Sequence, residues 1–152
     1  MQIDDTDRRI LRRLQADPAR PVAELAELAG VTQATCARRL DKLARAGILR
    51  GQSAVIHWPS LGYEVEVALR VTLDKTDPRA FDEFIAEARE VPEVIEIQTF
   101  LGRVDVRLLI LARDMAHYQH LYRTRVLTLP HITDIEALVA VSEIKSEEAL
   151  PL

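Results

Sequence analysis

The chain has 152 residues, of which 48% are hydrophobic and 29% charged, a composition typical of a globular protein and not of a disordered one. Its net charge is −4, and its single cysteine, Cys36, excludes an internal disulfide. The first 30 residues alternate in charge, and no apolar stretch approaches the ~18 residues that span a bilayer. We therefore expect no signal peptide, no membrane span and a cytoplasmic protein.

The charge is divided unevenly along the chain. Residues 1–60 carry ten Lys and Arg against seven Asp and Glu, a balance of +3, whereas residues 61–152 have a balance of −7. Within the first part, residues 31–51 hold five basic residues and one acid. This asymmetry favours contact between the first part and a polyanion, although a chance fluctuation would give the same pattern.

Two short helices are predicted in the first part of the chain. Residues 3–18 show apolar residues at helical spacing, with Asp4 or Asp5 available as a cap and Asp17-Pro18 as the stop. Residues 22–29 repeat this spacing and end at Gly30, a residue suited to the left-handed backbone that closes a helix.

A third helix is predicted from the cap Thr32 to about Ala46, with Cys36 on its inward side as an inert core residue. Two helices joined by a tight glycine-containing turn are typical of a helix-turn-helix, whose second helix fits the major groove of DNA. We expect residues near its start to face base edges and later basic residues to contact phosphates. The predicted DNA-binding residues are Thr32, Gln33, Ala34, Thr35, Arg38, Arg39, Lys42, Arg45 and Arg50.

Basic residues on an exposed helix face commonly contact only water, so they do not decide for DNA by themselves. The turn at Gly30 and the spacing of three helices favour the DNA-binding interpretation.

The rest of the sequence divides into a linker and a second domain. Residues 52–62 contain a β-prone run punctuated by Pro59 and Gly62, which predicts a β-strand linker. We therefore assign residues 1–51 to a helix-turn-helix DNA-binding domain and residues 63–152 to a separate domain.

This second domain alternates predicted strands and helices. Strands are expected at residues 63–73, 93–101, 103–112 and 132–144, and helices at residues 77–91 and 114–130. The order βαββαβ is that of a ferredoxin-like domain with an antiparallel sheet, and the chain as a whole is α+β.

Two helices cover only one face of such a sheet. The neighbours of Leu69 and Val71 then line the opposite face, which in a small domain calls for a partner, most simply a second copy related by two-fold symmetry. A dimer of this kind would read paired DNA half-sites.

Several short motifs, in their order and spacing, resemble the leucine-responsive and asparagine-synthesis regulators of bacteria and archaea, the Lrp/AsnC family. The motifs are IDDTDRRILRRLQADPAR, LAELAGVTQATCARRLDKLARAGILRG, AVIHWPSLG, VPEVIEI, LGRVDVRLLI, DMAHY, LPHI and VSEIKSEEALPL. The likeness covers nearly the whole chain.

The resemblance implies a transcription regulator with an N-terminal winged helix-turn-helix and a C-terminal domain that binds a small effector, usually an amino acid. It also implies homodimers that assemble into tetramers or octamers, with the effector at an interface between C-terminal domains. The effector-binding residues that it implies are Leu101, Gly102, Arg103, Val104, Asp105, Met115, Leu138, Val139 and Ala140.

The turn around Gly102 offers a physical reason for such a site. Backbone N–H groups there could bind the carboxylate of the effector, and Asp105 could either order the turn or meet an ammonium group. The bulky pair Phe100-Leu101 departs from the small polar residues common in the family, so the identity of the effector stays open.

Two further positions depart from the family pattern. Val22 stands where a Ser or Thr cap is usual, so the second helix starts less firmly. His131 stands where a glycine is usual, so the turn into the last strand lacks a residue with glycine's backbone freedom.

Two other functions remain alternatives. The architecture resembles domains that process tetrapyrroles, and His117 and His120 are spaced i, i+3 on a helix as a metal or haem pair would be. No third ligand and no catalytic pattern accompany them, so we predict no enzyme, no metal and no cofactor. A small-molecule-sensing module without DNA binding is the other alternative, which the basic residues of the third helix disfavour.

Overall fold

The computed structural model describes residues 2–146 and 149–152. The chain forms two compact units, one from Met1–Val55 together with Lys145–Leu152, and one from Ile56–Ile144. We expected residues 63–152 to form a single domain, and the structure instead places the last eight residues with the N-terminal unit.

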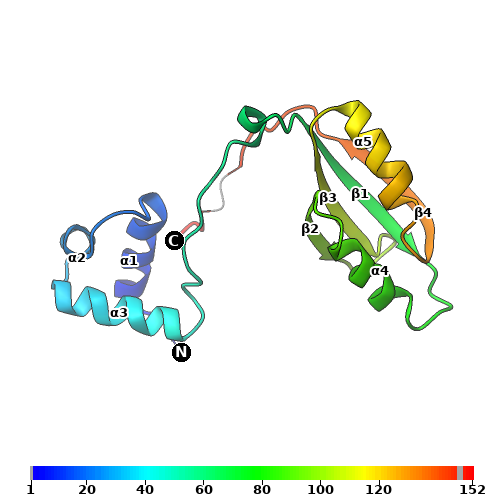
Figure 1. Cartoon of the computed structure of the whole chain (residues 1–152). Helices are drawn as coiled ribbons and strands as arrows, with labels where there is room; N and C mark the ends of the chain where they lie inside the picture. Colours follow the sequence, from blue (N-terminus) through cyan, green and yellow to red (C-terminus); the bar gives the residue numbers. More distant parts are fainter. Residues whose placement is uncertain (1, 147–148) are drawn as a thin grey trace. The chain divides into compact units, whose positions relative to one another are not determined.

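The N-terminal unit contains three helices, α1 (Asp5–Ala16), α2 (Val22–Ala29) and α3 (Gln33–Arg45) (Figure 1). Their apolar sides meet in a small core. The fully or almost fully buried members of this core are Ile10, Leu14, Leu25, Ala26, Ala29 and Cys36. The predicted helices and the α2–α3 turn are therefore confirmed.

The residues that end and begin these helices are those that the sequence predicted. Gly30 has the left-handed φ of 68° and closes α2, while Thr32 caps α3 by accepting a hydrogen bond from the N–H of Thr35 at 3.2 Å. Helix α2 has no side-chain cap, as the absence of a Ser or Thr at Val22 predicts. Burial raises the pKa of the Cys36 thiol, which is consistent with an inert core residue.

The start of α1 is held by a capping box that also binds α3. Asp4 accepts a hydrogen bond from the N–H of Asp7 at 2.8 Å, and Asp7 accepts one from the N–H of Asp4 at 3.2 Å. The guanidinium of Arg39 contacts both carboxylates, at 2.6 Å to Asp4 and 2.8 Å to Asp7. Because Asp7 is buried, this ion pair compensates a charge that would otherwise be costly in the core.

The second unit is built on a four-stranded antiparallel sheet with the strand order β2-β3-β1-β4. The strands are β1 (Val65–Leu73), β2 (Val94–Thr99), β3 (Val106–Ala112) and β4 (Ile132–Val139), and the helices are α4 (Ala80–Arg89) and α5 (Met115–Leu121). A π-helical turn at Tyr122–Val126 follows α5. The predicted order βαββαβ is confirmed.

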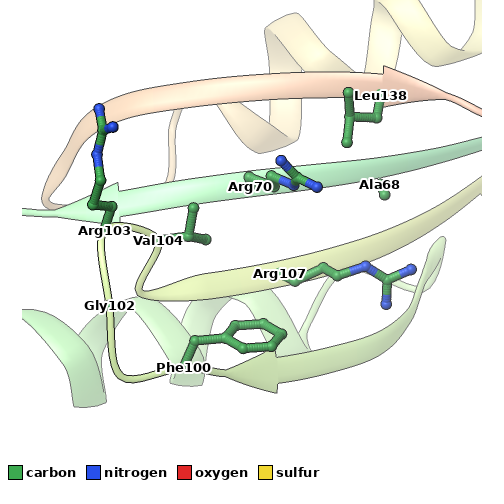
Figure 2. Close-up of a pocket in the computed structure, with 8 residues that line it drawn as sticks. All are labelled: Ala68, Arg70, Phe100, Gly102, Arg103, Val104, Arg107 and Leu138. Atoms are coloured by element: carbon green, nitrogen blue, oxygen red, sulfur yellow. The ribbon is translucent and has the colours of Figure 1, made fainter.

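The helices α4 and α5 cover one face of this sheet (Figure 1). Alternate residues of β1 and β3, such as Leu69, Val71 and Leu108, point to this side and are fully buried against Phe84 of α4. The residues between them face the other side, which no element of this unit covers (Figure 2). We call this side the open face of the sheet.

The predicted β-strand linker at residues 52–62 is wrong for the single chain. Residues 52–57 run as irregular backbone, and Trp58–Leu61 form a 3₁₀ turn. A strand needs a neighbour to satisfy its backbone, and no strand in the described part of the chain pairs with this segment. For the same reason the strands of a wing are absent between Ala46 and His57, and β4 ends at Val139 instead of at residue 144.

The C-terminal segment lies on α1. The side-chain amide of Gln15 donates to the carbonyl oxygen of Leu150 at 3.2 Å and accepts from the Leu150 N–H at 2.7 Å. The guanidinium of Arg12 donates to the carbonyl oxygen of Leu152. The N-terminal unit is thus completed by residues from the far end of the sequence.

His131 is strained where the sequence suggested it would be. Its φ of 65° makes it the one non-glycine residue with a left-handed backbone among those that the structure describes. Its carbonyl oxygen accepts the N–H of Asp74 at 2.8 Å, and its Nε2 lies 2.6 Å from Glu83 on α4. These contacts hold the turn before β4 in a conformation that a side chain disfavours.

We expect His131→Gly to be more stable than His131→Ala by about 1 kcal/mol, because only the alanine retains a Cβ in the left-handed region. Both variants lose the contact with Glu83, so their difference isolates the backbone strain. Urea unfolding followed by circular dichroism measures it. Equal midpoints and slopes for the two variants would contradict the strain.

A second prediction concerns the capping box in acid. The Arg39 guanidinium and the N–H of Asp7 lower the pKa of the Asp4 carboxyl from 3.8 to about 2. Because the folded pKa lies below the unfolded one, this charge adds stability that is fully present above about pH 4 and is lost as the pH falls towards 2. Asp4→Asn keeps the cap but not the charge. We expect it to unfold more easily than the parent at pH 7, and the difference in thermal midpoint to disappear near pH 2.

Candidate functional site

The outer side of α3 presents exposed basic and polar side chains. Gln33, Ala34, Arg38 and Lys42 are exposed, Thr35 is half-buried, and Arg50 follows the helix as another exposed cation. Arg45 is also exposed but pairs with Asp41 one turn earlier, at 3.0 Å. The helix therefore offers a surface on which positive charge exceeds negative charge.

Arg39 does not belong to this surface. Its guanidinium is turned inward to Asp4 and Asp7, and only a quarter of the side chain is exposed. Binding DNA through it would break two short ion pairs, one of them to a buried carboxylate. We therefore remove Arg39 from the predicted DNA contacts.

The second unit has an open cavity of about 580 Å³ on the open face of the sheet, within the range of small-molecule sites (Figure 2). It lies between the loop that joins β2 to β3 and the faces of β1, β3 and β4. The residues that line it are Ala68, Arg70, Phe100, Gly102, Arg103, Val104, Arg107 and Leu138.

Four of the nine predicted effector residues line this cavity, namely Gly102, Arg103, Val104 and Leu138. The other five lie elsewhere. Leu101 is fully exposed, and Met115 starts α5 on the helix-covered side. Val139 pairs with Val67 at the end of β4, and Ala140 donates its N–H to the carbonyl oxygen of Glu66.

Asp105 is buried and orders the turn, the first of the two roles that its sequence left open. Its carboxylate accepts the N–H of Leu73 at 2.9 Å and pairs with Lys75 at 3.2 Å, while its own N–H donates to the carbonyl oxygen of Val71. It is not among the residues that line the cavity. These contacts fasten the loop at Gly102 to the end of β1.

The backbone conformation at position 102 does not require a glycine, because φ lies outside the left-handed region. A Cβ at this position would also meet no atom within 4 Å. No hydrogen bond joins the N–H groups of Gly102, Arg103 or Val104 to another described residue. The loop therefore borders the cavity with unused backbone donors and with free space at its glycine.

Four residues of the cavity are not among those predicted from the sequence, namely Ala68, Arg70, Phe100 and Arg107. The signal for three of them was the alternation of the strands. Ala68 and Arg70 fall between the buried residues of β1, and Arg107 falls between buried residues of β3, so the period of two places them on the open face.

Arg70 and Arg107 lie directly opposite each other in the ladder of β1 and β3. Arg70 is paired with Glu136 on β4 at 3.4 Å, and Arg107 with Glu96 on β2 at 3.3 Å. Two like charges in this position repel, and the flanking acids offset the repulsion only in part because these pairs are partly exposed.

His117 has a structural role that the sequence did not reveal. Its Nδ1 accepts the N–H of Arg113 at 3.1 Å, and its Nε2 lies 3.9 Å from Glu93, whereas His120 is exposed. Among the described residues, no three His, Cys, Asp or Glu side chains are placed to hold a metal ion. In the same part of the chain, no helix has the length and apolar character needed to cross a membrane.

Comparisons with known proteins match both units. Residues 3–44 match the family model of the AsnC-type helix-turn-helix domain, and residues 66–150 match that of the Lrp/AsnC ligand binding domain. The proline dehydrogenase transcriptional activator of Rhodobacter capsulatus is 31% identical over 97% of this chain and 96% of its own. The leucine-responsive regulatory protein of Salmonella typhimurium is 29% identical over 97% and 90%.

Solved structures agree over the whole fold. A transcriptional regulator from Neisseria meningitidis, crystallised as a complex with L-Met, superposes with a TM-score of 0.91 at 29% identity and covers 99% of this chain and 97% of its own. AsnC of Escherichia coli has a TM-score of 0.87 at 25% identity, over 96% and 97%. With an AsnC-type helix-turn-helix and an Lrp/AsnC ligand-binding domain in the expected order, the chain belongs to the Lrp/AsnC family of transcriptional regulators.

Proposed function

We propose that this regulator binds specific DNA sequences through α3 and binds an amino-acid effector in the cavity of the open sheet face, which alters assembly and DNA binding. It works where DNA is, in the cytoplasm. The observation that carries the proposal is the exposed, cationic outer side of α3 on a helix-turn-helix.

The DNA-binding part rests on the division of arginines between two tasks. Arg39 is used inside the domain, whereas Arg38 and Lys42 have no partner among the described residues. Gln33, Ala34, Thr35 and Arg38 stand at the start of α3, the part of a recognition helix that reaches base edges. Thr32 holds that start as its cap, while Lys42, Arg45 and Arg50 are placed for phosphates.

The effector part rests on the loop at Gly102. Its unpaired N–H groups suit the α-carboxylate of an amino acid, and the missing side chain leaves room for a ligand. Asp105 fixes this loop from behind through Leu73 and Lys75. The related regulator from Neisseria meningitidis was crystallised with L-Met, which supports an amino acid as the class.

We also propose that the protein is a homodimer that assembles into tetramers or octamers. Ile56, Leu61, Val141 and Ile144 are large apolar residues that are more than half exposed in the single chain. The irregular backbone of residues 52–57 pairs with no strand among the described residues, which leaves it free to pair with a second chain. An effector that favours one assembly over another would change DNA binding through that equilibrium.

An enzyme is not favoured by these contacts. His117, one of the two imidazoles considered for a metal or haem, accepts a backbone N–H and so is engaged within the fold. A sensing module without DNA binding is disfavoured by the retained cations of α3. Regulation through DNA is the function that both units support together.

We expect Lys42→Ala to weaken binding to all DNA sequences and to lower the slope of log K against log salt by about one, because one phosphate contact is lost. Arg38→Ala should instead reduce the preference for the operator over random DNA by about 1–3 kcal/mol. Fluorescence anisotropy at several salt concentrations measures both. Arg89→Ala, which removes an exposed charge from α4, is the control. If Lys42→Ala and Arg89→Ala show the same salt slope, Lys42 does not contact a phosphate and α3 is not the DNA-binding helix.

For the effector, thermal unfolding against each of the twenty amino acids is the direct test. A ligand at about 100 times its dissociation constant adds ~2.7 kcal/mol to the free energy of unfolding and raises the midpoint. We expect at least one amino acid to do so, and Gly102→Ala to lose the shift while keeping the midpoint of the free protein, since its Cβ meets no atom. A shift that survives in Gly102→Ala would place the ligand elsewhere.

A further inference from the structure

The C-terminal end of α2 is held by a side chain of another helix. Arg9 of α1 donates from Nε to the carbonyl oxygen of Ala29 at 3.1 Å, and from Nη2 to the hydroxyl of Thr6 at 3.1 Å. Ala29 is the last residue of α2, so no later N–H of that helix can bond this oxygen. Because α2 has no basic residue in its own last turn, Arg9 also supplies the cation that stabilises the negative end of a helix.

This contact lies immediately before the turn between α2 and α3. Only three residues separate Ala29 from Gln33, the first residue of α3. One of them, Val31, donates its N–H to the carbonyl oxygen of Ala26 at 3.0 Å, and another, Thr32, caps α3. Because the turn is short and hydrogen-bonded to both helices, the position of Ala29 determines where α3 begins.

A second attachment holds α3 farther along its length. Arg39 reaches back to the start of α1, where its Nη1 lies 2.6 Å from Asp4 and 2.8 Å from Asp7. Arg39 stands six residues after Gln33, which is about 9 Å along an α-helix. Helix α1 therefore contacts α3 and its turn at two separated points, and two points define the direction of a helix whereas one would let it pivot.

We propose that Arg9 is a positioning residue for DNA recognition. It holds the end of α2 against α1 and, together with the Arg39 attachment, fixes the direction in which α3 meets the major groove. This inference rests on the proposed function, in which the start of α3 reaches base edges, and it adds a residue that acts without touching DNA. Since Nε and Nη2 of Arg9 are engaged inside the domain, its part is to orient the recognition helix.

The direction of α3 matters more for base contacts than for phosphate contacts. A hydrogen bond to a base edge requires a fixed alignment of donor and acceptor, whereas a lysine on its flexible stem follows a phosphate over a range of positions. A tilt of α3 therefore weakens base contacts of Gln33 and Arg38 and leaves a phosphate contact of Lys42 in place. The ratio of specific to non-specific binding is the quantity that reports on Arg9.

Fluorescence anisotropy of the full chain tests this role, with a duplex that the parent protein selects from a random library and a random-sequence duplex of equal length. We expect Arg9→Ala to lower the ratio of the two affinities about tenfold, the effect of weakening one base contact. Its binding to random DNA and its slope of log K against log salt should equal those of Arg13→Ala. This variant is the matched control, because it removes an equal charge from the exposed side of the same helix.

The choice of variants separates recognition from stability. Arg9 is changed and Arg39 is kept, because the partner of Arg9 is a neutral carbonyl, whereas removing Arg39 would leave the buried carboxylate of Asp7 unpaired. Affinities are compared at a temperature at which circular dichroism shows the helices of each variant intact. Arg9→Lys keeps the charge at the end of α2 but not the two-donor fork, and it should lower the ratio by a smaller factor. It also keeps the test decisive if Arg9→Ala does not fold.

Several results overturn the inference. A ratio equal to that of Arg13→Ala would show that Arg9 does not orient α3. A salt slope lower than that of the control by about one would show that Arg9 contacts a phosphate itself. If both affinities fall by the same factor, or if neither Arg9 variant keeps its helices, Arg9 serves stability alone. If the parent protein binds no DNA or selects no sequence, the proposed DNA-binding function fails as well, whereas it stands after each of the other results.

Discussion

The effector domain depends on one geometric constraint, the alternation of side chains along antiparallel strands. Since α4 and α5 cover one face only, every residue of β1 is either part of the core or part of the open face. Val67, Leu69 and Val71 take the first role, and Ala68 and Arg70 take the second. The core and the cavity are thus two sides of the same strand, and a shift of register by one residue would destroy both.

The N-terminal domain shows how neighbouring residues of one type separate into different tasks. Arg38 and Arg39 are adjacent, but a turn of about 100° per residue on a helix points them in different directions. Arg38 faces outward from α3, whereas Arg39 closes the capping box at the start of α1. This internal ion pair joins the start of the first helix to the third.

The sequence predicted the elements well because local patterns decide them. Gly30 marks the end of α2 and Thr32 the start of α3, as the sequence predicted. The alternation of apolar residues with a period of two predicted the strands, and strands and helices together gave the order βαββαβ. The site was harder, since its residues come from three strands and a loop. Period and spacing cannot tell that Asp105 turns to Leu73 and away from the cavity, or that Arg39 finds a buried carboxylate.

The remaining errors concern segments that need a partner distant in sequence. The linker at residues 52–62 has strand propensity, but no strand within residues 2–146 and 149–152 pairs with it to form a ladder. The segment at residues 149–152 has no marked pattern, and the contacts of Leu150 with Gln15 follow only from the fold. Neither the conformation of the linker nor the position of residues 149–152 is determined by residues that are close in sequence.

The placement of this last segment on α1 has a consequence for biosynthesis. Eighty-nine residues, Ile56–Ile144, separate Val55 from Lys145, the two points at which the chain leaves and rejoins the N-terminal unit. At translation rates of about 5–20 residues per second, roughly 5–20 s pass between the emergence of the three helices and that of the residues that cover Arg12 and Gln15. During that interval the DNA-binding helices are already assembled beside the ribosome, with this side of α1 still open to other molecules.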